Sequence, residues 1–305
     1  MAMVLGIDGG GTKTVAVVAR DGNALGRGES GGTNLNTLQE ADVAAHLREA
    51  CDAALYSAGV DAGAVQSLCA GVAGVASADK GEARIRGMLE SMFKAPIQVV
   101  DDVEIALEAA FRGGPGVAAI CGTGSIARGR NAAGERARAG GWGSIVSDEG
   151  SGAWIGQNAV RTLLRACDMG EEPALLKQFY EAWGVADRAQ FVAACNRSPL
   201  PNFAALAPLV IAVEKDGPMG ELMERAGRTF ADTACIVVGR LWLPYEAAKV
   251  CMFGGIFQAS ARMRRAFSLA LMSEFSNISV QMCEAEPVEG ALFLAENKLT
   301  AKAGN

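Results

Sequence analysis

A glycine-rich turn occurs twice in this chain, each time between two short apolar runs, and it constrains the fold more than any other feature. The first turn, DGGGTKT at residues 8–14, follows MVLGI and precedes VAVVA. The second, GTGS at residues 122–125, follows GVAAIC and precedes IARGR. Glycine lacks a Cβ, so such a turn lets backbone N–H groups converge on an anion. The repetition predicts two hairpins that can bind phosphate, in an internally duplicated chain.

The first half of the chain continues in a regular order after its glycine turn. A third strand follows the turn DGN, and two helical stretches flank a short apolar run that suits a buried strand. A last strand ends on VVDD and leads into the helical pattern VEIAL. The predicted elements after the hairpin are a strand at 24–30, a helix at about 37–60, a strand at 67–74, a helix at about 80–93 and a strand at 96–102.

The second half begins in the same way and is then longer. A third strand at 136–141 follows its hairpin, and the chain beyond residue 150 is mostly helical as far as KVCMFGG. A basic amphipathic helix separates the strand at 249–253 from the strand at 278–283, and a terminal helix begins at Pro287. Both halves therefore predict mixed α/β structure that opens on a glycine hairpin.

The boundary between the halves is predicted at RGGPG, which breaks the helix VEIALEAAF. We expect an α/β fold of two similar domains, residues 1–114 and 115–305, with a cleft between them. The terminal helix could instead pack back on the first domain.

The single histidine excludes several kinds of catalytic site. Serine triads, clustered histidine zinc sites and iron facial triads need imidazoles that one residue, His46, cannot supply alone. His46 lies in the helical pattern ADVAAHLREA, where we expect it to be packed or solvated. Acid–base chemistry then falls to a carboxylate, a lysine, a tyrosine or a cysteine.

Charge and cysteine content point to a small-molecule protein of a reducing compartment. A net charge of -6 disfavours a protein that coats the phosphates of a nucleic acid. The eight cysteines form no C-x-x-C motif and lie mostly among aliphatic residues. The start has no basic segment before an apolar core, and no apolar run reaches the length of about 18 residues that a membrane span needs. We expect a cytoplasmic protein with no membrane or nucleic-acid partner.

Three phosphate-binding chemistries compete for the glycine turns. A P-loop needs lysine directly after its last glycine and then a helix, whereas Thr12 precedes Lys13 here and a strand follows. Gly122, Gly124 and Ala127 mimic a dinucleotide fingerprint, but that motif also opens a helix. The remaining interpretation is a pair of hairpins, one from each half, that bind the β- and γ-phosphates of ATP.

Five segments resemble one known family in the expected order and over nearly the whole chain. They are GIDGGGTKT, VVDDVEIAL, CGTGS, GGWGSIVSDEGSGAWIG and FGGIF. Together they resemble the BadF/BadG/BcrA/BcrD ATPase family and its N-acetylglucosamine kinase branch. This resemblance implies the duplicated ribonuclease H-like fold of actin, hexokinase and Hsp70, and a kinase that uses ATP and Mg²⁺.

The resemblance also implies roles for individual residues around the nucleotide. Asp8 matches the residue that organises Mg²⁺, Asp101 a neighbouring position able to contact the ion, and Asp102 the catalytic base. Each aspartate has a plain alternative, because Asp8 could cap its own loop and the other two could cap a helix. The residues matched to ATP are Gly9, Gly10, Gly11, Thr12, Lys13, Gly122, Thr123, Gly124, Ser125, Gly254 and Gly255.

The expected acceptor site is polar. The resemblance assigns sugar hydroxyls to Asn34 and Asp148, with alternatives of a turn residue for Asn34 and a core side chain for Trp142. Ile126 stands where some kinases of the family carry an asparagine directed at the sugar, so the recognised hydroxyl pattern stays open. The full expected set is Asn34, Gly141, Trp142, Gly143, Asp148 and Glu149.

The function implied is transfer of phosphate from ATP to the 6-hydroxyl of an amino sugar, with N-acetylglucosamine as the first expectation. Separately, the apolar helical stretch RTFADTACIVVGRLWL suggests the face of a homodimer, with core packing as the alternative. Glucosamine is the nearest competing acceptor. A second reading is an ATPase that activates 2-hydroxyacyl-CoA dehydratases through an iron–sulfur cluster, for which Cys121 and Cys167 are the available thiols. A third is a sugar sensor that has lost catalysis.

Overall fold

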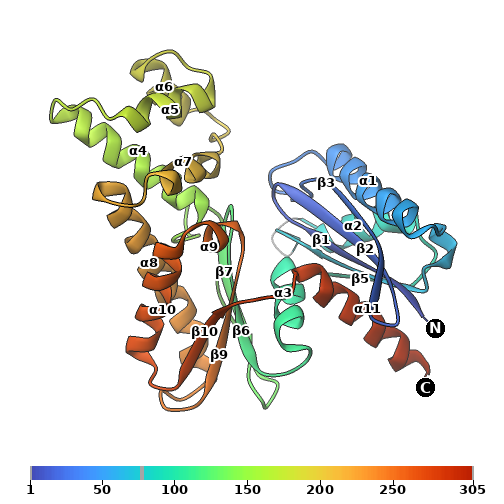
Figure 1. Ribbon diagram of the computed structural model, residues 1–305. Coiled ribbons are helices and arrows are strands. Elements are labelled where there is room, and N and C mark those ends of the chain that lie inside the picture. The colour runs from blue at the N-terminus through green and yellow to red at the C-terminus, as the bar shows by residue number, and fades with distance from the viewer. Residues whose placement is uncertain (1, 76–78, 304–305) are drawn as a thin grey trace. The chain divides into compact units, whose positions relative to one another are not determined.

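The computed structural model describes residues 2–75 and 79–303. The chain divides into two compact units, Met1–Gly114 together with Cys283–Asn305, and Pro115–Met282. It leaves the first unit inside the RGGPG segment and returns to it after the last strand, as the colours in Figure 1 show. Each unit has its own sheet and its own buried core.

The sheet of the first unit has the strand order β3-β2-β1-β4-β5. β1, β2 and β3 are antiparallel, whereas β1, β4 and β5 are parallel, so their carboxyl ends share one edge. The strands are β1 (Met3–Gly9), β2 (Lys13–Arg20), β3 (Asn23–Gly31), β4 (Ser67–Val72) and β5 (Ile97–Val100).

Alternate residues of these strands build two different layers. Leu5, Ile7 and Val18 lie in the cluster that includes Leu47 of α1 (Glu40–Ala58) and Ile85 of α2 (Gly81–Glu90). On the opposite face, Val4 and Cys69 pack with Ile105 of α3 (Asp102–Phe111) and Ala291 of α11 (Pro287–Ala303). Figure 1 shows α3 and α11 side by side against this sheet. A short 3-10 helix, Ala62–Ala64, follows α1.

The second unit repeats the strand order of the first, with β8-β7-β6-β9-β10 in place of β3-β2-β1-β4-β5. β6 is antiparallel to β7 and parallel to β9, as β1 is to β2 and β4. The strands are β6 (Gly116–Cys121), β7 (Ser125–Arg130), β8 (Arg136–Gly140), β9 (Ala248–Phe253) and β10 (Ile278–Met282). The duplicated α/β fold expected from the sequence is therefore confirmed.

A long helical insertion between β8 and β9 enlarges the second unit. Its core joins the sheet to the apolar faces of α4 and α8, with Phe230 and Phe257 in ring contact. Most apolar residues of α8, including Val237 and Val238, are buried in this core. The helices of this unit are α4 (Gly152–Asp168), α5 (Ala174–Trp183), α6 (Arg188–Cys195), a 3-10 turn (Phe203–Leu206), α7 (Ala207–Ala212), α8 (Gly217–Leu241), α9 (Gly255–Ala259) and α10 (Ala261–Glu274).

The predicted helix at 37–60 is shorter than expected at both ends. Asn34 begins a turn in which its Oδ1 atom accepts the Asn36 N–H at 2.9 Å, which delays the helix to Glu40. At the other end Gly59 adopts φ +67 and closes α1 through bonds to Leu55 and Tyr56 carbonyls. None of the helices within the described residues has the length and apolar content needed to cross a membrane.

The contact between α3 and α11 depends on a glycine. A Cβ at Gly290 would lie 1.9 Å from the Ile105 carbonyl oxygen. We expect Gly290→Ala to lower the free energy of unfolding by roughly 1–3 kcal/mol, the usual cost of overpacking a close contact. Gly87→Ala is the matched control, because no atom lies within 4 Å of a Cβ there and alanine favours the interior of α2 by about 1 kcal/mol. Urea unfolding measures both; equal effects would contradict this view of the helix contact.

Candidate active site

The first glycine turn is held by contacts that a larger residue would prevent. It joins β1 to β2, and the Gly10 N–H donates to the Lys13 carbonyl at 2.8 Å. A Cβ at Gly9 would lie 2.2 Å from Thr33 Oγ1, and the Thr33 N–H donates to the Gly10 carbonyl at 2.9 Å. The turn predicted at residues 8–14 is therefore a hairpin packed against the segment that carries Asn34.

Three residues that sequence reasoning did not place in the site hold this segment. Thr14 Oγ1 donates to the Gly31 carbonyl at 2.7 Å and contacts Thr33 Oγ1 at 3.2 Å, and both threonines are fully buried. His46 Nδ1 lies 2.7 Å from the Gly32 carbonyl oxygen, which makes this nitrogen the donor. The packed role expected for His46 is thus a specific one, namely to fix the backbone before Asn34. A hydroxyl next to a glycine turn was the signal available for Thr14.

Asp8 is the second-last residue of β1 and, like Val4, points to the sheet face that α11 covers. Burial first, and then the negative charges of Asp102 and Glu286, raise the pKa of this carboxyl to about 7, against the opposing effects of Lys13 and Arg27. Asp8 and Asp102 therefore lie close enough to repel each other when both are ionised. The alternative that Asp8 only caps its own loop does not explain this pairing of carboxyls.

Asp101 and Asp102 mark the start of α3. Asp101 occupies the N-cap position without a capping bond from its side chain, and Asp102 is the first helical residue. Asp102 Oδ1 accepts the Val103 N–H at 2.9 Å. Because α3 follows β5, the parallel strands place Asp102 at the same sheet edge as Asp8.

Asn34 is half-buried and lies beside Gly74. Its Oδ1 atom accepts the Asn36 N–H, so the role of turn residue that we considered is present. A Cβ at Gly74 would lie 2.6 Å from that Oδ1 atom. The chain beyond Gly74 includes residues 76–78, which lie outside the described structure.

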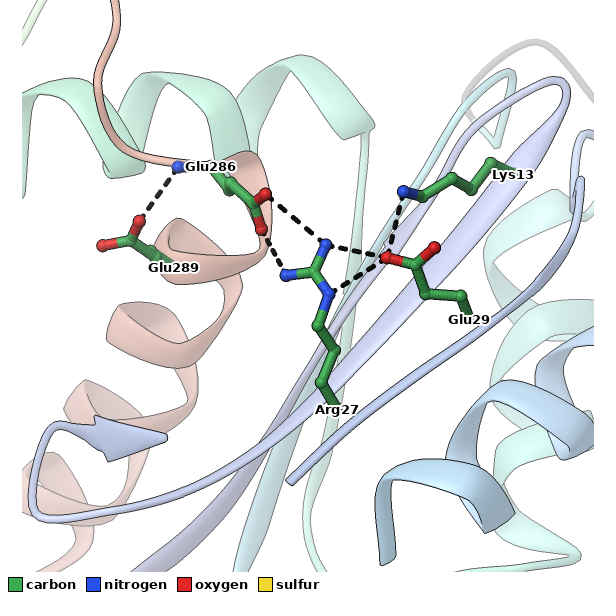
Figure 2. Close-up of polar contacts among 5 residues, drawn as sticks. All are labelled: Lys13, Arg27, Glu29, Glu286 and Glu289. Atoms are coloured by element: carbon green, nitrogen blue, oxygen red, sulfur yellow. Dashed lines mark hydrogen bonds and ion pairs between the residues drawn. The ribbon is translucent and has the colours of Figure 1, made fainter. Parts of the chain in front are cut away.

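Lys13 lies on the surface with a carboxylate partner. Its Nζ atom donates to Glu29 Oε1 at 3.0 Å, and Figure 2 shows the pair with Arg27 and Glu286. Gly11 and Thr12 complete the turn between Gly10 and Lys13. The backbone of this turn also comes close to the segment after β3, because a Cβ at Gly32 would lie 2.3 Å from the Gly11 carbonyl oxygen.

The second glycine turn is closed by the start of α4. The Gly122 N–H donates to the Gly124 carbonyl at 2.9 Å. The Gly152 and Ala153 N–H groups donate to the carbonyls of Gly122 and Thr123 at 2.8 and 3.1 Å. Loop carbonyls thus satisfy two of the N–H groups that a helix start leaves open.

Gly254 passes directly over the end of β6. It adopts φ +100, and a Cβ there would lie 2.2 Å from the Cys121 carbonyl oxygen. Gly255 then begins α9. The structure therefore brings the Gly254–Gly255 pair, which joins β9 to α9, to the second glycine turn.

Asp148 is the most constrained side chain of this second cluster. It is buried, adopts φ +62, and accepts backbone N–H groups of Gly143 and Ser125. Burial raises the pKa of its carboxyl, and those two bonds oppose the rise. Among the residues described, none donates a hydrogen bond to Asp148 Oδ1, which is itself buried. A buried oxygen left in this state is suited to a ligand hydroxyl.

Glu149 and Ser125 tie Asp148 to the turn. Ser125 Oγ donates to the Glu149 carbonyl at 2.8 Å, and Ser147 Oγ lies 3.2 Å from Glu149 Oε2. A Cβ at Gly124 would lie 2.7 Å from Asp148 Oδ2. The predicted phosphate and sugar residues of this unit thus form one cluster.

Trp142 is 68% exposed, so the alternative that it is a core residue is wrong. Gly141 and Gly143 flank it with φ +70 and φ +98, conformations that favour glycine. The Arg138 guanidinium carbon lies 4.4 Å from the centroid of the Trp142 ring, and Arg138 Nη2 donates to the Gly141 carbonyl. One face of the indole is thus covered by arginine.

The carboxylates at Asp8 suit Mg²⁺ but can supply only some of its ligands. Carboxylate oxygens suit this ion, and the two mutually repelling groups Asp8 and Asp102 would be relieved by a cation. Over residues 2–75 and 79–303, no group of three or more His, Cys, Asp or Glu side chains forms a metal cluster. The protein would therefore supply one or two ligands, with water and phosphate oxygens completing the shell.

The raised pKa of Asp8 predicts a pH dependence of stability. The pKa is about 7 in the folded chain against an ordinary 3.8, so between these values the folded state holds the extra proton. The free energy of unfolding then falls as pH rises through this window. We expect Asp8→Asn to gain stability relative to the natural protein as pH rises from about 4 to about 8, measured by urea unfolding. A difference between variant and natural protein that does not change with pH would contradict the assignment.

Comparison with known proteins places these two clusters in a family. Residues 5–295 match the BadF/BadG/BcrA/BcrD ATPase family. The chain is 38% identical over 181 residues to the N-acetylmuramic acid/N-acetylglucosamine kinase of Clostridium acetobutylicum, a match that spans 58% of each protein. It is 27% identical over 311 residues to the N-acetyl-D-glucosamine kinase of Dictyostelium discoideum, which covers 96% of this chain and 97% of the relative.

A solved structure from Chromobacterium violaceum, provisionally described as an N-acetylglucosamine kinase, has the same fold. Its TM-score is 0.78 at 26% identity, with 97% of this chain and 99% of the other covered. The family match extends over both glycine turns and both sheets. The chain therefore belongs to the BadF/BadG/BcrA/BcrD ATPase family.

Proposed function

We propose that this protein is an ATP-dependent kinase that phosphorylates the 6-hydroxyl of an amino sugar, N-acetylglucosamine first. The observation that carries the proposal is the equivalent position of the two glycine turns. Each turn joins the first antiparallel pair of its sheet, β1 to β2 and β6 to β7, beside the carboxyl ends of parallel strands. Each unit thus offers one N–H-rich hairpin to the phosphates of ATP. Both curated relatives are named as kinases of N-acetylglucosamine.

Asp102 is the proposed general base. It begins α3, at the sheet edge where Asp8 lies. Its carboxylate would take the proton of the sugar hydroxyl while the hydroxyl oxygen bonds to the γ-phosphorus and the bond to the bridging oxygen of ADP breaks. Asp8, with Asp101 as a weaker candidate, would hold Mg²⁺, which offsets phosphate charge when bound.

The acceptor is proposed to bind at Asp148. Its buried Oδ1 atom, which receives no hydrogen bond from the described residues, suits a sugar hydroxyl as donor. The exposed indole of Trp142 offers an apolar surface to a sugar ring, and Asn34 contributes amide chemistry from the first unit. Glucosamine stays the competing acceptor, because a few contacts to the 2-substituent decide between an N-acetyl group and an ammonium.

The thiols do not favour the alternative of a dehydratase activator with an iron–sulfur cluster. Cys121 is fully buried, its Sγ lies 3.4 Å from the Gly150 carbonyl, and burial raises the pKa of the thiol. Cluster ligation requires thiolates. Cys167 packs against the same core as Cys121, so both thiols act as small core side chains.

A homodimer is part of the proposal. Most apolar residues of α8 are buried in the core of its own unit. Ile236 of α8 and Leu269 and Met272 of α10 are more than half exposed. These side chains are the apolar surface available to a second copy on these helices.

Asp102→Asn tests the catalytic assignment. We expect kcat to fall by roughly 10²- to 10⁴-fold, the usual contribution of a positioned general base, while the sugar still binds. Asp61→Asn is the control, because it makes the same carboxylate-to-amide change at the start of another helix, where Asp61 is the N-cap of Ala62–Ala64. A coupled ADP assay and sugar titration calorimetry provide the two readouts. A variant with nearly normal kcat would remove Asp102 from this role.

The acceptor is tested with the natural protein. N-acetylglucosamine, glucosamine, N-acetylmannosamine and N-acetylmuramic acid are compared in the same assay, with the product identified by phosphorus NMR. We expect the highest kcat/KM for N-acetylglucosamine and a 6-phosphate product. Preference for glucosamine would correct the acceptor, whereas nucleotide binding without transfer to any of the four would favour the sensor.

A further inference from the structure

Four charged side chains form a continuous chain of ion pairs beside the first glycine turn (Figure 2). Lys13 Nζ lies 3.0 Å from Glu29 Oε1, and Arg27 Nε donates to the same oxygen at 3.0 Å. Arg27 then binds Glu286 with both terminal nitrogens, with Nη2 lying 3.4 Å from Glu286 Oε1. We call Lys13, Glu29, Arg27 and Glu286 the charge chain. It has two positive and two negative members, so its net charge is zero.

The charge chain lies on the same face of the sheet as Asp8. Val15 is paired with Asp8 on one side and with Glu29 on the other, and paired residues of neighbouring strands point to the same face. Lys13 precedes Val15 by two residues and therefore also points to that face. Lys13 and the carboxylate of Asp8 are thus on the same side of the sheet.

Glu286 anchors the far end of the chain to the protein core. It is the residue before α11, and its N–H donates to Glu289 Oε1 at 2.9 Å, as in a helix capping box. Two residues later, Val288 is buried against Val15 and Val17 of β2. Arg27 is consequently held by a carboxylate whose backbone has little freedom.

An unrestrained lysine would be a poor ligand for a flexible polyphosphate. Ordering a long side chain on binding costs free energy, and Lys13 is half-exposed at the surface. An ammonium has three N–H donors, so it can bind Glu29 and phosphate oxygens together. The positive charge of Arg27 offsets that of Glu29, which would otherwise repel the phosphates.

We propose that Glu29 is a positioning residue that presents the Lys13 ammonium to the phosphates of ATP, and that Arg27, fixed by Glu286, holds Glu29 in place. The proposal rests on the assignment of the first glycine turn to ATP. It explains why charged residues stand on β3 and directly before α11.

A double-mutant cycle tests the positioning role. The Kd for Mg²⁺ with a non-hydrolysable ATP analogue is measured for the natural protein, Lys13→Gln, Glu29→Gln and the double variant. We expect Glu29→Gln to weaken binding by roughly 2- to 10-fold, the equivalent of ordering one long side chain. In the Lys13→Gln background the same change should have almost no effect, because the group that Glu29 positions is gone.

Arg27→Gln should weaken binding in the same range, again only when Lys13 is present. Arg84→Gln is the matched control, since it removes another surface ion pair of this unit, to Glu40 at 2.8 Å, and should leave the Kd unchanged. Unfolding midpoints are measured alongside, because a role confined to fixing α11 would lower stability without changing the Kd.

Several outcomes would overturn the proposal. They are equal effects of Glu29→Gln with and without Lys13, tighter binding by Glu29→Gln, or an unchanged Kd for Lys13→Gln. The readout needs no sugar, so it separates the two hypotheses. Intact coupling in a protein that phosphorylates no amino sugar would defeat the proposed acceptor alone, and an active sugar kinase without coupling would defeat the positioning role alone.

Discussion

The architecture of both candidate clusters depends on glycines at positions where a neighbouring segment leaves no room for a side chain. Gly9 meets Thr33, and Gly254 meets the carbonyl of Cys121, at distances that no Cβ could occupy. Without these approaches the first turn would separate from the segment that carries Asn34, and the strand end at β9 would lift away from the second turn. Glycine is therefore required here for proximity, and in the second case also for a positive φ.

The polar groups of the first unit are ordered by a helix from the other end of the sequence. α11 lies on the sheet face that carries Asp8, and its first turn brings Glu286 and Val288 to β2 and β3. Burial under this layer raises the pKa of Asp8, and the charges of Asp102 and Glu286 act in the same direction. The packing of α11 against this sheet thus affects both the assembly of the charge chain and the ionisation of Asp8.

Much of this fold could be predicted from local patterns. Apolar runs that end on glycine or aspartate predicted where strands end. The two halves were predicted to open with the same order of elements, and their two sheets have the same strand order. The return of α11 to the first unit could not be read from its own sequence, because its apolar residues would suit a layer on either sheet. α1 begins later than predicted because of one hydrogen bond, which the Asn36 N–H donates to Asn34 Oδ1.

The residues of the candidate site could be predicted from the sequence better than their conformations and contacts. Gly141 and Gly143 could be expected to bend the chain, but only the structure shows that Asp148 takes a left-handed conformation and keeps a buried oxygen without a donor among the described residues. The partner of Lys13 lies 16 residues away on another strand and is set by the register of β2 and β3. The role of His46 likewise depends on α1 packing against β3.

The central claim is that both glycine turns bind the phosphates of one nucleotide. Hydrogen–deuterium exchange, followed by mass spectrometry with and without Mg²⁺ and a non-hydrolysable ATP analogue, measures this for each turn separately. We predict that backbone amides of residues 9–13 and of residues 122–125 both become protected when the analogue is present. Protection of only one turn, or of neither, would contradict the claim.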